Sequence, residues 1–172
     1  MEHRIGGLEK QDITGNVSYD PANHEHMVKT RAAKIAGIEP AGPGYLWTGP
    51  EDGQVLIIGW GSTYGAIKAA TLELQKEGVA VSACHIRYMN PLPKELGGKF
   101  KHFEHVLVPE MNLGQLLMIL RGRYLVDAKG LNKVRGQPFT ISEIVRGVKQ
   151  LLAGRRITVE KAEVEVGAAD GG

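Results

Sequence analysis

The side chains that could most readily take part in catalysis or binding lie together in one short stretch, from Glu110 to Gln115. Glu110 supplies a carboxylate, Asn112 and Gln115 supply carboxamides, and Gly114 stands between the two carboxamides. A single carboxylate in a turn beside a helix N-terminus more often accepts hydrogen bonds from backbone amides, or contacts another chain, than it catalyses a reaction. We therefore predict that Glu110, Asn112, Gly114 and Gln115 form a structural turn or a subunit contact, and we expect no catalytic residue in this chain.

Histidine and cysteine side chains do not form a convincing metal or nucleophile pattern. His24 and His26 fall on a polar predicted helix, where side chains two residues apart diverge. Cys84 and His85 are neighbours on a predicted strand, so they point to opposite faces of the sheet and do not form a thiolate–imidazole pair. There is no Ser-His-Asp order, no phosphate loop and no paired-carboxylate motif, and we predict no metal site.

The glycine-rich stretch Gly59-Trp60-Gly61-Ser62-Thr63-Tyr64-Gly65 invites comparison with a dinucleotide-binding fingerprint. Its last glycine comes one residue too late for that motif, and Trp60 would crowd a pyrophosphate. Arg87 and Asn90, rather than an acidic residue for a ribose hydroxyl, follow the next predicted strand. Tight packing of strand against helix is therefore the expected role, and a free-standing nucleotide-binding module is the alternative.

A group of basic residues follows the central turn and is diluted only by Asp127. One interpretation is a solvated rim; the other is a docking surface for an acidic partner or a phosphate-bearing ligand. The residues are Arg121, Arg123, Lys129, Lys133 and Arg135.

A strand and a helix must position the Glu110 turn. Residues 106–108 form a short apolar, β-branched run typical of a buried strand, and Pro109 should end its pairing because proline has no N–H to donate. Asn112 is a good N-cap, and Gln115 can close a capping box. We expect the helix to stop at Gly122. Its buried face is predicted to carry Leu113, Leu116, Leu117 and Leu120.

The rest of the pattern alternates strands with helices. Strands are predicted at 55–59, 79–86 and 123–127. One helix is predicted from the Gly61–Thr63 turn, where a hydroxyl could act as cap, to Gly78. A short helix is predicted near 94–96, and a last one from Thr140 to Gly154. Thr140 and Glu143 form another capping box. Alternation at this spacing predicts an α/β fold with a three-layer open, mostly parallel sheet, whose sites lie at the carboxyl ends of the strands.

The chain divides into three parts by composition. Residues 1–53 comprise an extended arm, a polar helix at 21–36 capped by Asp20 and ended by Gly37, and a Pro/Gly-rich linker. Residues 54–154 form the α/β domain, and residues 155–172 are expected to be a tail. The thin apolar stripe of the polar helix indicates that it lies across a surface or between domains.

Composition narrows the function classes. The 172 residues carry a net charge of +2, too small to suggest nucleic-acid binding. No apolar run approaches the ~18 residues of a membrane span, and no signal peptide is visible. The single cysteine excludes a disulfide framework, so we expect a cytoplasmic protein.

Three motifs resemble the alpha subunit of the 2-oxoacid:ferredoxin oxidoreductases, most closely the 2-oxoglutarate type. They are the connector Gly7-Leu8-Glu9-Lys10-Gln11-Asp12-Ile13-Thr14-Gly15-Asn16-Val17-Ser18-Tyr19-Asp20-Pro21 with His24, Met27, Arg31 and Lys34 after it, the Glu110–Leu116 turn, and Gly136-Gln137-Pro138-Phe139. The connector departs from the family pattern at Lys10 and Gln11, where the family has His and Asp, and at Gly6.

This resemblance implies a domain similar to the C-terminal domain of transketolase, which is Rossmann-like, in an enzyme that converts a 2-oxoacid to its acyl-CoA and passes electrons to ferredoxin. The complex is implied to use thiamine diphosphate, magnesium, an iron–sulfur cluster and coenzyme A, none of them held by this chain. In the family a pyrimidine-binding domain precedes the connector, so we expect a short subunit or a truncated chain. The implied partners are the beta subunit, other oxidoreductase subunits and, indirectly, ferredoxin, in an oligomer without nucleic acid or membrane.

Overall fold

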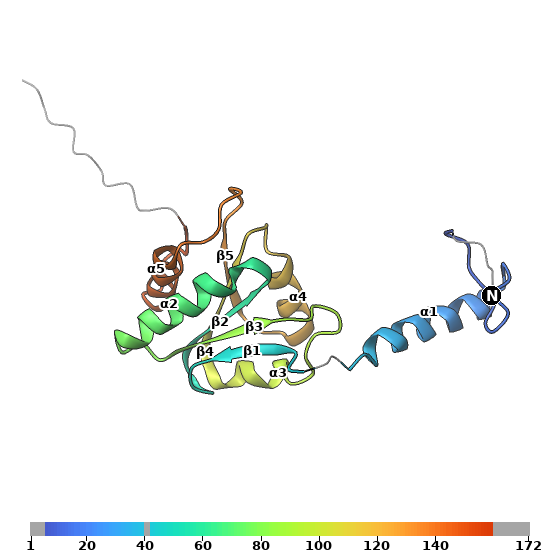
Figure 1. Cartoon of the computed structure of the whole chain (residues 1–172), viewed down its shortest axis with the longest axis horizontal. Coiled ribbons are helices and arrows are strands. Elements are labelled where there is room, and N and C mark those ends of the chain that lie inside the picture. The colour runs from blue at the N-terminus through green and yellow to red at the C-terminus, as the bar shows by residue number, and fades with distance from the viewer. Residues whose placement is uncertain (1–5, 40–41, 160–172) are drawn as a thin grey trace, which may run out of the picture.

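The computed structural model describes residues 6–39 and 42–159. Within these ranges a helix precedes an α/β domain (Figure 1). The elements are α1 (Pro21–Ala36), β1 (Tyr45–Thr48), β2 (Gly53–Trp60), η1 (Gly61–Thr63, a 3₁₀ turn), α2 (Tyr64–Lys76), β3 (Val81–Ile86), α3 (Leu96–Lys99), η2 (Phe100–His102, 3₁₀), β4 (Phe103–Glu110), α4 (Gln115–Tyr124), β5 (Ala128–Asn132) and α5 (Ile141–Leu152).

One sheet organises the described part of the domain, with strand order β1-β3-β2-β4-β5. The pairs β3–β2, β2–β4 and β4–β5 are parallel, and only β1 runs antiparallel, at the edge beside β3. The central strand β2 is buried from Val55 to Gly59, as expected of a parallel strand covered on both faces. The mostly parallel α/β fold predicted from the sequence is confirmed.

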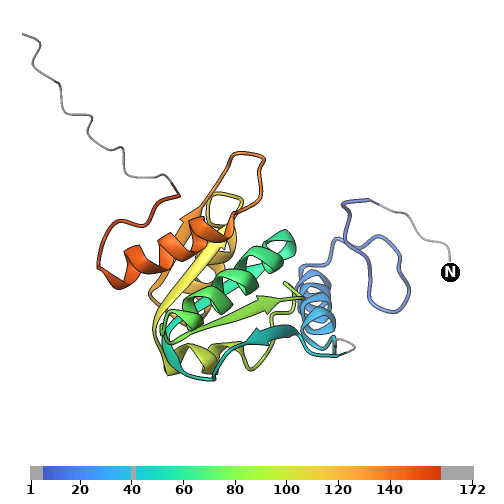
Figure 2. The same cartoon turned by 60° about the vertical axis from the view of Figure 1, so that its left-hand side comes forward.

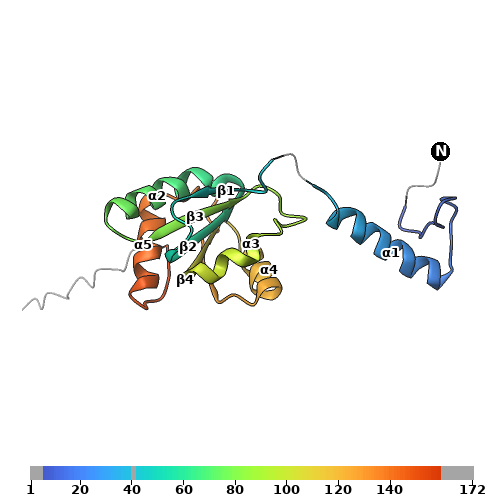
Figure 3. The same ribbon diagram turned by 90° about the horizontal axis from the view of Figure 1, so that it is seen from below.

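Helices cover both faces of the sheet, which gives three layers (Figures 2 and 3). On one face α2 and α5 pack through a buried cluster that includes Ile67, Leu74 and Ile144. On the other face α3 and α4 pack through a second cluster that includes Leu96 and Leu116. Alternate residues of β2 feed the two clusters, because successive side chains of a strand point to opposite faces.

Strand β4 extends further than predicted. Its ladder with β2 ends at Leu107, whereas its ladder with β5 continues through Pro109 and Glu110. Alternate residues of a strand direct their N–H groups to opposite neighbours, so a proline removes a donor on one side only. The prediction that pairing ends at Pro109 is therefore wrong on the β5 side.

Helix α4 begins and ends later than predicted. Gly114 is the N-cap, with a φ of 98°, and the helix passes through Gly122 to Tyr124. Leu125 follows in the left-handed conformation, with a φ of 52°. Because the helix occupies residues 123 and 124 and Leu125 reverses the chain, the predicted strand at 123–127 is wrong, and β5 begins at Ala128. At the other end of the helix, Leu113 is exposed rather than part of the buried face.

The arm before α1 is folded rather than extended. A β-bridge joins Lys10 to Val17, and the carboxylate of Glu9 accepts two hydrogen bonds of 3.0 Å from the Arg31 guanidinium on α1. The predicted extended arm is wrong because the polar surface of α1 itself provides partners for it. Helix α1 has its predicted bounds, buries no residue, and points away from the sheet (Figures 1 and 3).

The Pro/Gly-rich stretch between α1 and β2 contributes strand β1 to the sheet. The Trp47 ring packs against Phe103 with centroids 6.0 Å apart, which attaches this stretch to the start of β4. In the described residues after α5, the Val159 carbonyl accepts a 2.6 Å hydrogen bond from Arg146. The predicted tail otherwise lies largely outside the described residues. Among the helices that the structure describes, none is long and apolar enough to cross a membrane.

Candidate functional site

The candidate site lies at the carboxyl ends of β2 and β4, where the topology of the sheet reverses. The connection from β2 through α2 leads to β3 over one face, and the connection from β4 through α4 leads to β5 over the other. Such a switch point leaves a crevice in which ligands commonly bind. The sequence placed Glu110 and the Gly59–Gly65 stretch at this edge, and the structure brings them together.

Glu110 lies at the centre of this edge and is completely buried. Its Oε1 accepts hydrogen bonds from Leu116 N at 2.9 Å, Asn112 Nδ2 at 3.1 Å and Trp60 Nε1 at 3.3 Å, and its Oε2 accepts one from Leu117 N at 3.0 Å. All four partners are donors, so the carboxylate neutralises the positive end of α4 and satisfies two of its first amides. The side chain is fully engaged in holding the turn.

Asn112 and Gln115 differ from the predicted capping box. Asn112 Oδ1 accepts hydrogen bonds from Gly114 N at 2.7 Å and Gln115 N at 3.1 Å. No side chain caps the helix from Gly114, and Gln115 contributes its backbone amide to Asn112 rather than its side chain to a capping box. The predicted capping box is wrong because the helix begins at Gln115, with Gly114 as its N-cap, so Asn112 lies two residues before the N-cap position.

The end of β5 closes the turn from the other side. Asn132 Nδ2 donates a 2.9 Å hydrogen bond to the Asn112 carbonyl, and Lys133 N donates one of 3.0 Å to the Glu110 carbonyl. Sequence reasoning missed Asn132. The available signal was a carboxamide at the carboxyl end of a neighbouring parallel strand, but the strand itself was predicted five residues too early.

The glycine-rich stretch after β2 serves packing. A Cβ on Gly59 would lie 2.2 Å from Cδ1 of Ile67 and 2.7 Å from Oγ1 of Thr63, so any side chain there would displace these two buried side chains. Thr63 Oγ1 donates to the Trp60 carbonyl at 2.8 Å, and Ser62 Oγ lies 3.7 Å from the Met111 sulfur. Neither hydroxyl caps α2, contrary to prediction, because the 3₁₀ turn η1 comes between strand and helix.

The basic residues 121–135 are dispersed. Arg121 and Arg123 are exposed on α4, Lys129 pairs with Asp127 at 2.8 Å, and Arg135 is exposed in the loop after β5. Lys133 is only 5% exposed, and its Nζ lies 2.9 Å from both carboxylate oxygens of Glu143 and from the Pro138 carbonyl. It therefore does not belong to a solvated rim. It fixes the loop between β5 and α5.

Glu143 also completes the predicted capping box with Thr140. Burial raises the pKa of Glu143, but the hydrogen bonds from Lys133 and Thr140 and the charge of Lys133 outweigh that effect and hold the pKa below its ordinary value. The loop thus closes on an ion pair next to a helix N-terminus.

Histidine and cysteine side chains lie as their spacing predicted. The Cys84 side chain is buried, and burial raises the pKa of its thiol to about 12. The His85 ring packs 4.9 Å from the Tyr64 ring, and burial lowers the pKa of His85. His24 and His26 lie on α1 at 2.6 Å and 2.8 Å from carboxylates of the arm.

The chain's donor set does not fit the metal groups of the implied complex. An iron–sulfur cluster of the ferredoxin kind needs four cysteine thiolates, and this sequence has one cysteine. In the part of the chain that the structure describes, no three His, Cys, Asp or Glu side chains lie close enough together to hold a metal ion.

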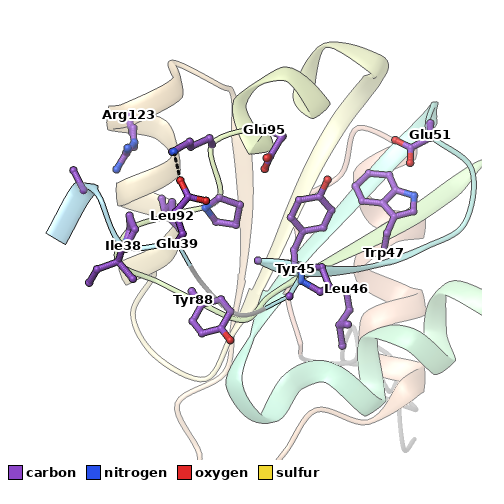
Figure 4. A pocket seen from close by; sticks show the side chains of 17 residues that line it. Ile38, Glu39, Tyr45, Leu46, Trp47, Glu51, Tyr88, Leu92, Glu95 and Arg123 are labelled. Atoms are coloured by element: carbon purple, nitrogen blue, oxygen red, sulfur yellow. Dashed lines mark hydrogen bonds and ion pairs between the residues drawn. The ribbon is translucent and has the colours of Figure 1, made fainter. Parts of the chain in front are cut away.

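A pocket of about 920 Å³ lies between the end of α1, β1 and the loop before α3 (Figure 4). The rings of Tyr45, Trp47 and Tyr88 line it, and Lys94 Nζ bonds Glu39 Oε1 at 2.8 Å on its α1 side. Sequence reasoning missed this pocket, although three consecutive large apolar residues inside a Pro/Gly-rich stretch, Tyr45 to Trp47, pointed to it.

Comparison with known proteins gives consistent matches. The family model "Pyruvate:ferredoxin oxidoreductase core domain II" matches residues 53–162. The 2-oxoglutarate oxidoreductase subunit KorA of Mycobacterium tuberculosis is 43% identical over 169 residues, covering 94% of this chain and 24% of that protein. The 2-oxoacid:ferredoxin oxidoreductase 1 subunit alpha of Aeropyrum pernix is 30% identical over 156 residues, covering 86% of this chain and 24% of that protein.

A solved structure matches as well. The 2-oxoglutarate:ferredoxin oxidoreductase of Magnetococcus marinus, with 2-oxoglutarate, coenzyme A and succinyl-CoA bound, superposes with a TM-score of 0.74 and 31% identity. The match covers 87% of this chain and 26% of that one. The chain thus spans about a quarter of the length of these relatives.

Proposed function

This chain belongs to the pyruvate:ferredoxin oxidoreductase core domain II family, and from that membership we propose that it forms part of the alpha subunit of a 2-oxoacid:ferredoxin oxidoreductase. The reaction proposed is oxidative decarboxylation of a 2-oxoacid to its acyl-CoA, with the electrons passed to ferredoxin. The 2-oxoacid proposed is 2-oxoglutarate, because the relatives named KorA and the similar solved structure are 2-oxoglutarate enzymes by name.

Within that enzyme the chain acts as scaffold and subunit contact. The observation that carries this proposal is the environment of Glu110, the candidate catalytic carboxylate, whose two oxygens accept four hydrogen bonds inside this chain. A side chain so engaged holds α4 against the sheet. No chemical step passes through it, and Asn112, Gly114 and Gln115 form the turn that it stabilises.

Thiamine diphosphate, magnesium, the iron–sulfur cluster and coenzyme A are assigned to other parts of the complex. The partners proposed are the thiamine-dependent beta subunit, further oxidoreductase subunits and, through them, ferredoxin. The connector and linker at residues 1–53, from which strand β1 joins the sheet, the α/β domain at 54–154 and the segment 155–172 are proposed as the divisions of the chain. The single cysteine offers no disulfide framework, which suits a reducing compartment, and we place the enzyme in the cytoplasm.

Reconstitution tests this proposal. The chain and all remaining parts of the enzyme from the same organism, including the part that carries the pyrimidine-binding domain and the thiamine-dependent subunit, are purified separately and mixed, and reduction of ferredoxin is measured with coenzyme A and either 2-oxoglutarate or pyruvate. We expect turnover with 2-oxoglutarate only when the chain is present. Full turnover in its absence would contradict the proposed role, and a preference for pyruvate would contradict the proposed substrate.

The nucleotide-binding alternative finds no specific support at the carboxyl edge. Gly59 gives room to the closely packed Ile67 side chain, and the Trp60 indole donates to Glu110 at the end of the neighbouring strand. An equilibrium titration of the chain with ATP and NAD tests the alternative directly. Micromolar binding of either nucleotide would support the nucleotide-binding alternative.

A further inference from the structure

The exposed side of α4 carries two residues that disfavour the isolated helix. We define the outer face of α4 as Met118, Ile119, Gly122 and Leu125. Met118 and Gly122 are four residues apart and so share one side of the helix, Ile119 lies next to Met118, and Leu125 follows the last helical residue. Met118 is 65% exposed and Leu125 is 90% exposed. Figure 3 shows α4 on the outside of its layer, beside α3.

Gly122 has no local reason to be glycine. It lies within α4 and does not have a positive φ, and a Cβ added there would meet no atom within 4 Å. Alanine would fit and would favour the helix, because glycine loses more backbone entropy than any other residue on folding. A glycine on an exposed helix face instead lets another element approach the helix closely.

Leu125 shows the opposite mismatch. It occupies the position after α4 where the chain turns left-handed, with a φ of 52°, and its N–H donates to the Arg121 carbonyl at 3.0 Å. Glycine or asparagine is the usual residue there, because a Cβ is unfavourable in this conformation. The leucine occupies a strained backbone conformation while its side chain is 90% exposed. Such strain persists where a side chain has to be presented to something else.

The charges around this face indicate what covers it. Arg121 and Arg123 flank the outer face, and the neighbouring Asp127 is already paired with Lys129. Two copies of this chain meeting face to face would bring four arginines together, which opposes self-association. A segment with an apolar centre and acidic residues at its edges is complementary to this face, because the face has an apolar centre and arginines at its edges.

We propose that the outer face of α4 is the docking surface for the thiamine-dependent beta subunit, which contributes an apolar segment rimmed by carboxylates. This rests on the proposed function and deepens it. The Glu110 network holds the N-terminus of α4, so the face is presented on a fixed helix. Gly122 admits the partner's backbone, Met118 and Leu125 contact its apolar side chains, and the two arginines pair with its acidic rim.

The test uses substitutions whose effects on folding and on binding have opposite signs. Gly122→Ala and Leu125→Gly are each expected to raise the melting temperature of the full chain by about 2–4 °C, since each relieves a local conflict. Each is also expected to weaken binding of the purified beta subunit about tenfold, measured by calorimetry. Gly65→Ala is the matched control, because Gly65 is exposed on α2 in the opposite layer and also has open space around its Cβ.

A charge substitution provides a second, independent variant. Met118→Glu should weaken binding by about tenfold or more through repulsion by the acidic rim, whereas Leu72→Glu, at an exposed leucine of α2, should not. Wild-type chain that binds the beta subunit while all three α4 variants bind equally well would overturn the docking surface alone. Failure of the wild-type chain to bind would overturn the proposed function with it. Self-association in sedimentation that Gly122→Ala abolishes would replace the proposed occupant with a second copy.

Discussion

Replacement of Glu110 by glutamine measures how much the central carboxylate stabilises the fold. Glutamine keeps an oxygen for the three donors on Oε1, but its amide nitrogen would face Leu117 N–H, donor against donor, where Oε2 now accepts at 3.0 Å. Leaving one buried amide unsatisfied costs about 1–3 kcal/mol, and loss of the negative charge at a partly buried helix N-terminus costs up to ~2 kcal/mol. We expect Glu110→Gln to lose about 3 kcal/mol, or about 6–12 °C in melting temperature for a domain of this size.

Thermal and urea unfolding, followed by circular dichroism, measure this effect. Glu104→Gln is the matched control, because Glu104 is an exposed residue of the same strand and its neutralisation should change stability by less than about 0.5 kcal/mol. Hydrogen exchange should locate the loss, with faster exchange at Leu116 N and Leu117 N than at amides of α2. A Glu110→Gln variant that melts within about 1 °C of the wild-type chain would refute the view that this carboxylate holds the turn.

Three further predictions concern other parts of the chain. Lys133→Met leaves the half-buried Glu143 carboxylate without its cation and should destabilise the chain by about 3 kcal/mol in urea unfolding; a loss below about 1 kcal/mol would contradict a structural ion pair. Hydrogen bonds from Arg31, Lys10 N and His24 lower the pKa of Glu9 from 4.5 to about 2, so attachment of the arm to α1 should persist at neutral pH and be lost as the pH falls from 4.5 towards 2, as measured by NMR titration of Glu9. Release above pH 5 would refute this. Burial raises the pKa of Cys84 to about 12, so iodoacetamide at pH 8 should alkylate it only after unfolding, and rapid native-state labelling would contradict its burial.

Capping residues and apolar periodicity predicted those helices and strands whose bounds are set by residues of the element itself. The bounds of α1 followed from Asp20-Pro21 and Gly37, and the capping box of α5 followed from Thr140 and Glu143. The buried run of β2 and the parallel sheet followed from periodicity and order alone. For each cap and for the buried run of β2, the residues that decide the structure are within a few positions of one another.

The errors arose where a distant neighbour decided the local structure. Glu110 accepts hydrogen bonds from the first amides of α4, and its contact with Trp60 spans 50 residues, so no local motif could reveal this network. Leu125 adopts a left-handed conformation that leucine rarely takes, which concealed both the end of α4 and the start of β5. Lys133 was assigned to the surface on charge alone, because its partner Glu143 lies in the next helix.

At the candidate site, too, local features could be predicted from the sequence and contacts between distant residues could not. Sequence alone placed the Glu110 turn at the carboxyl edge and favoured binding of backbone amides over chemistry for the carboxylate. The family resemblance pointed to the alpha subunit of a 2-oxoacid oxidoreductase. The hydrogen bonds of Trp60 and Asn132 to the Glu110 turn required the fold, because those side chains come from strands on either side of β4.

The turnover number of the assembled enzyme with Glu110→Gln tests most directly whether this chain contributes structure rather than chemistry. Complex containing the variant is isolated by size exclusion, at a temperature below the melting point of the variant, and 2-oxoglutarate-dependent reduction of ferredoxin is measured per mole of complex. We predict a lower yield of complex, with a kcat within about twofold of wild type, since no proton transfer passes through Glu110. A loss of about 10²–10⁴ in kcat from fully assembled complex, as expected for removal of a general acid or base, would contradict that claim.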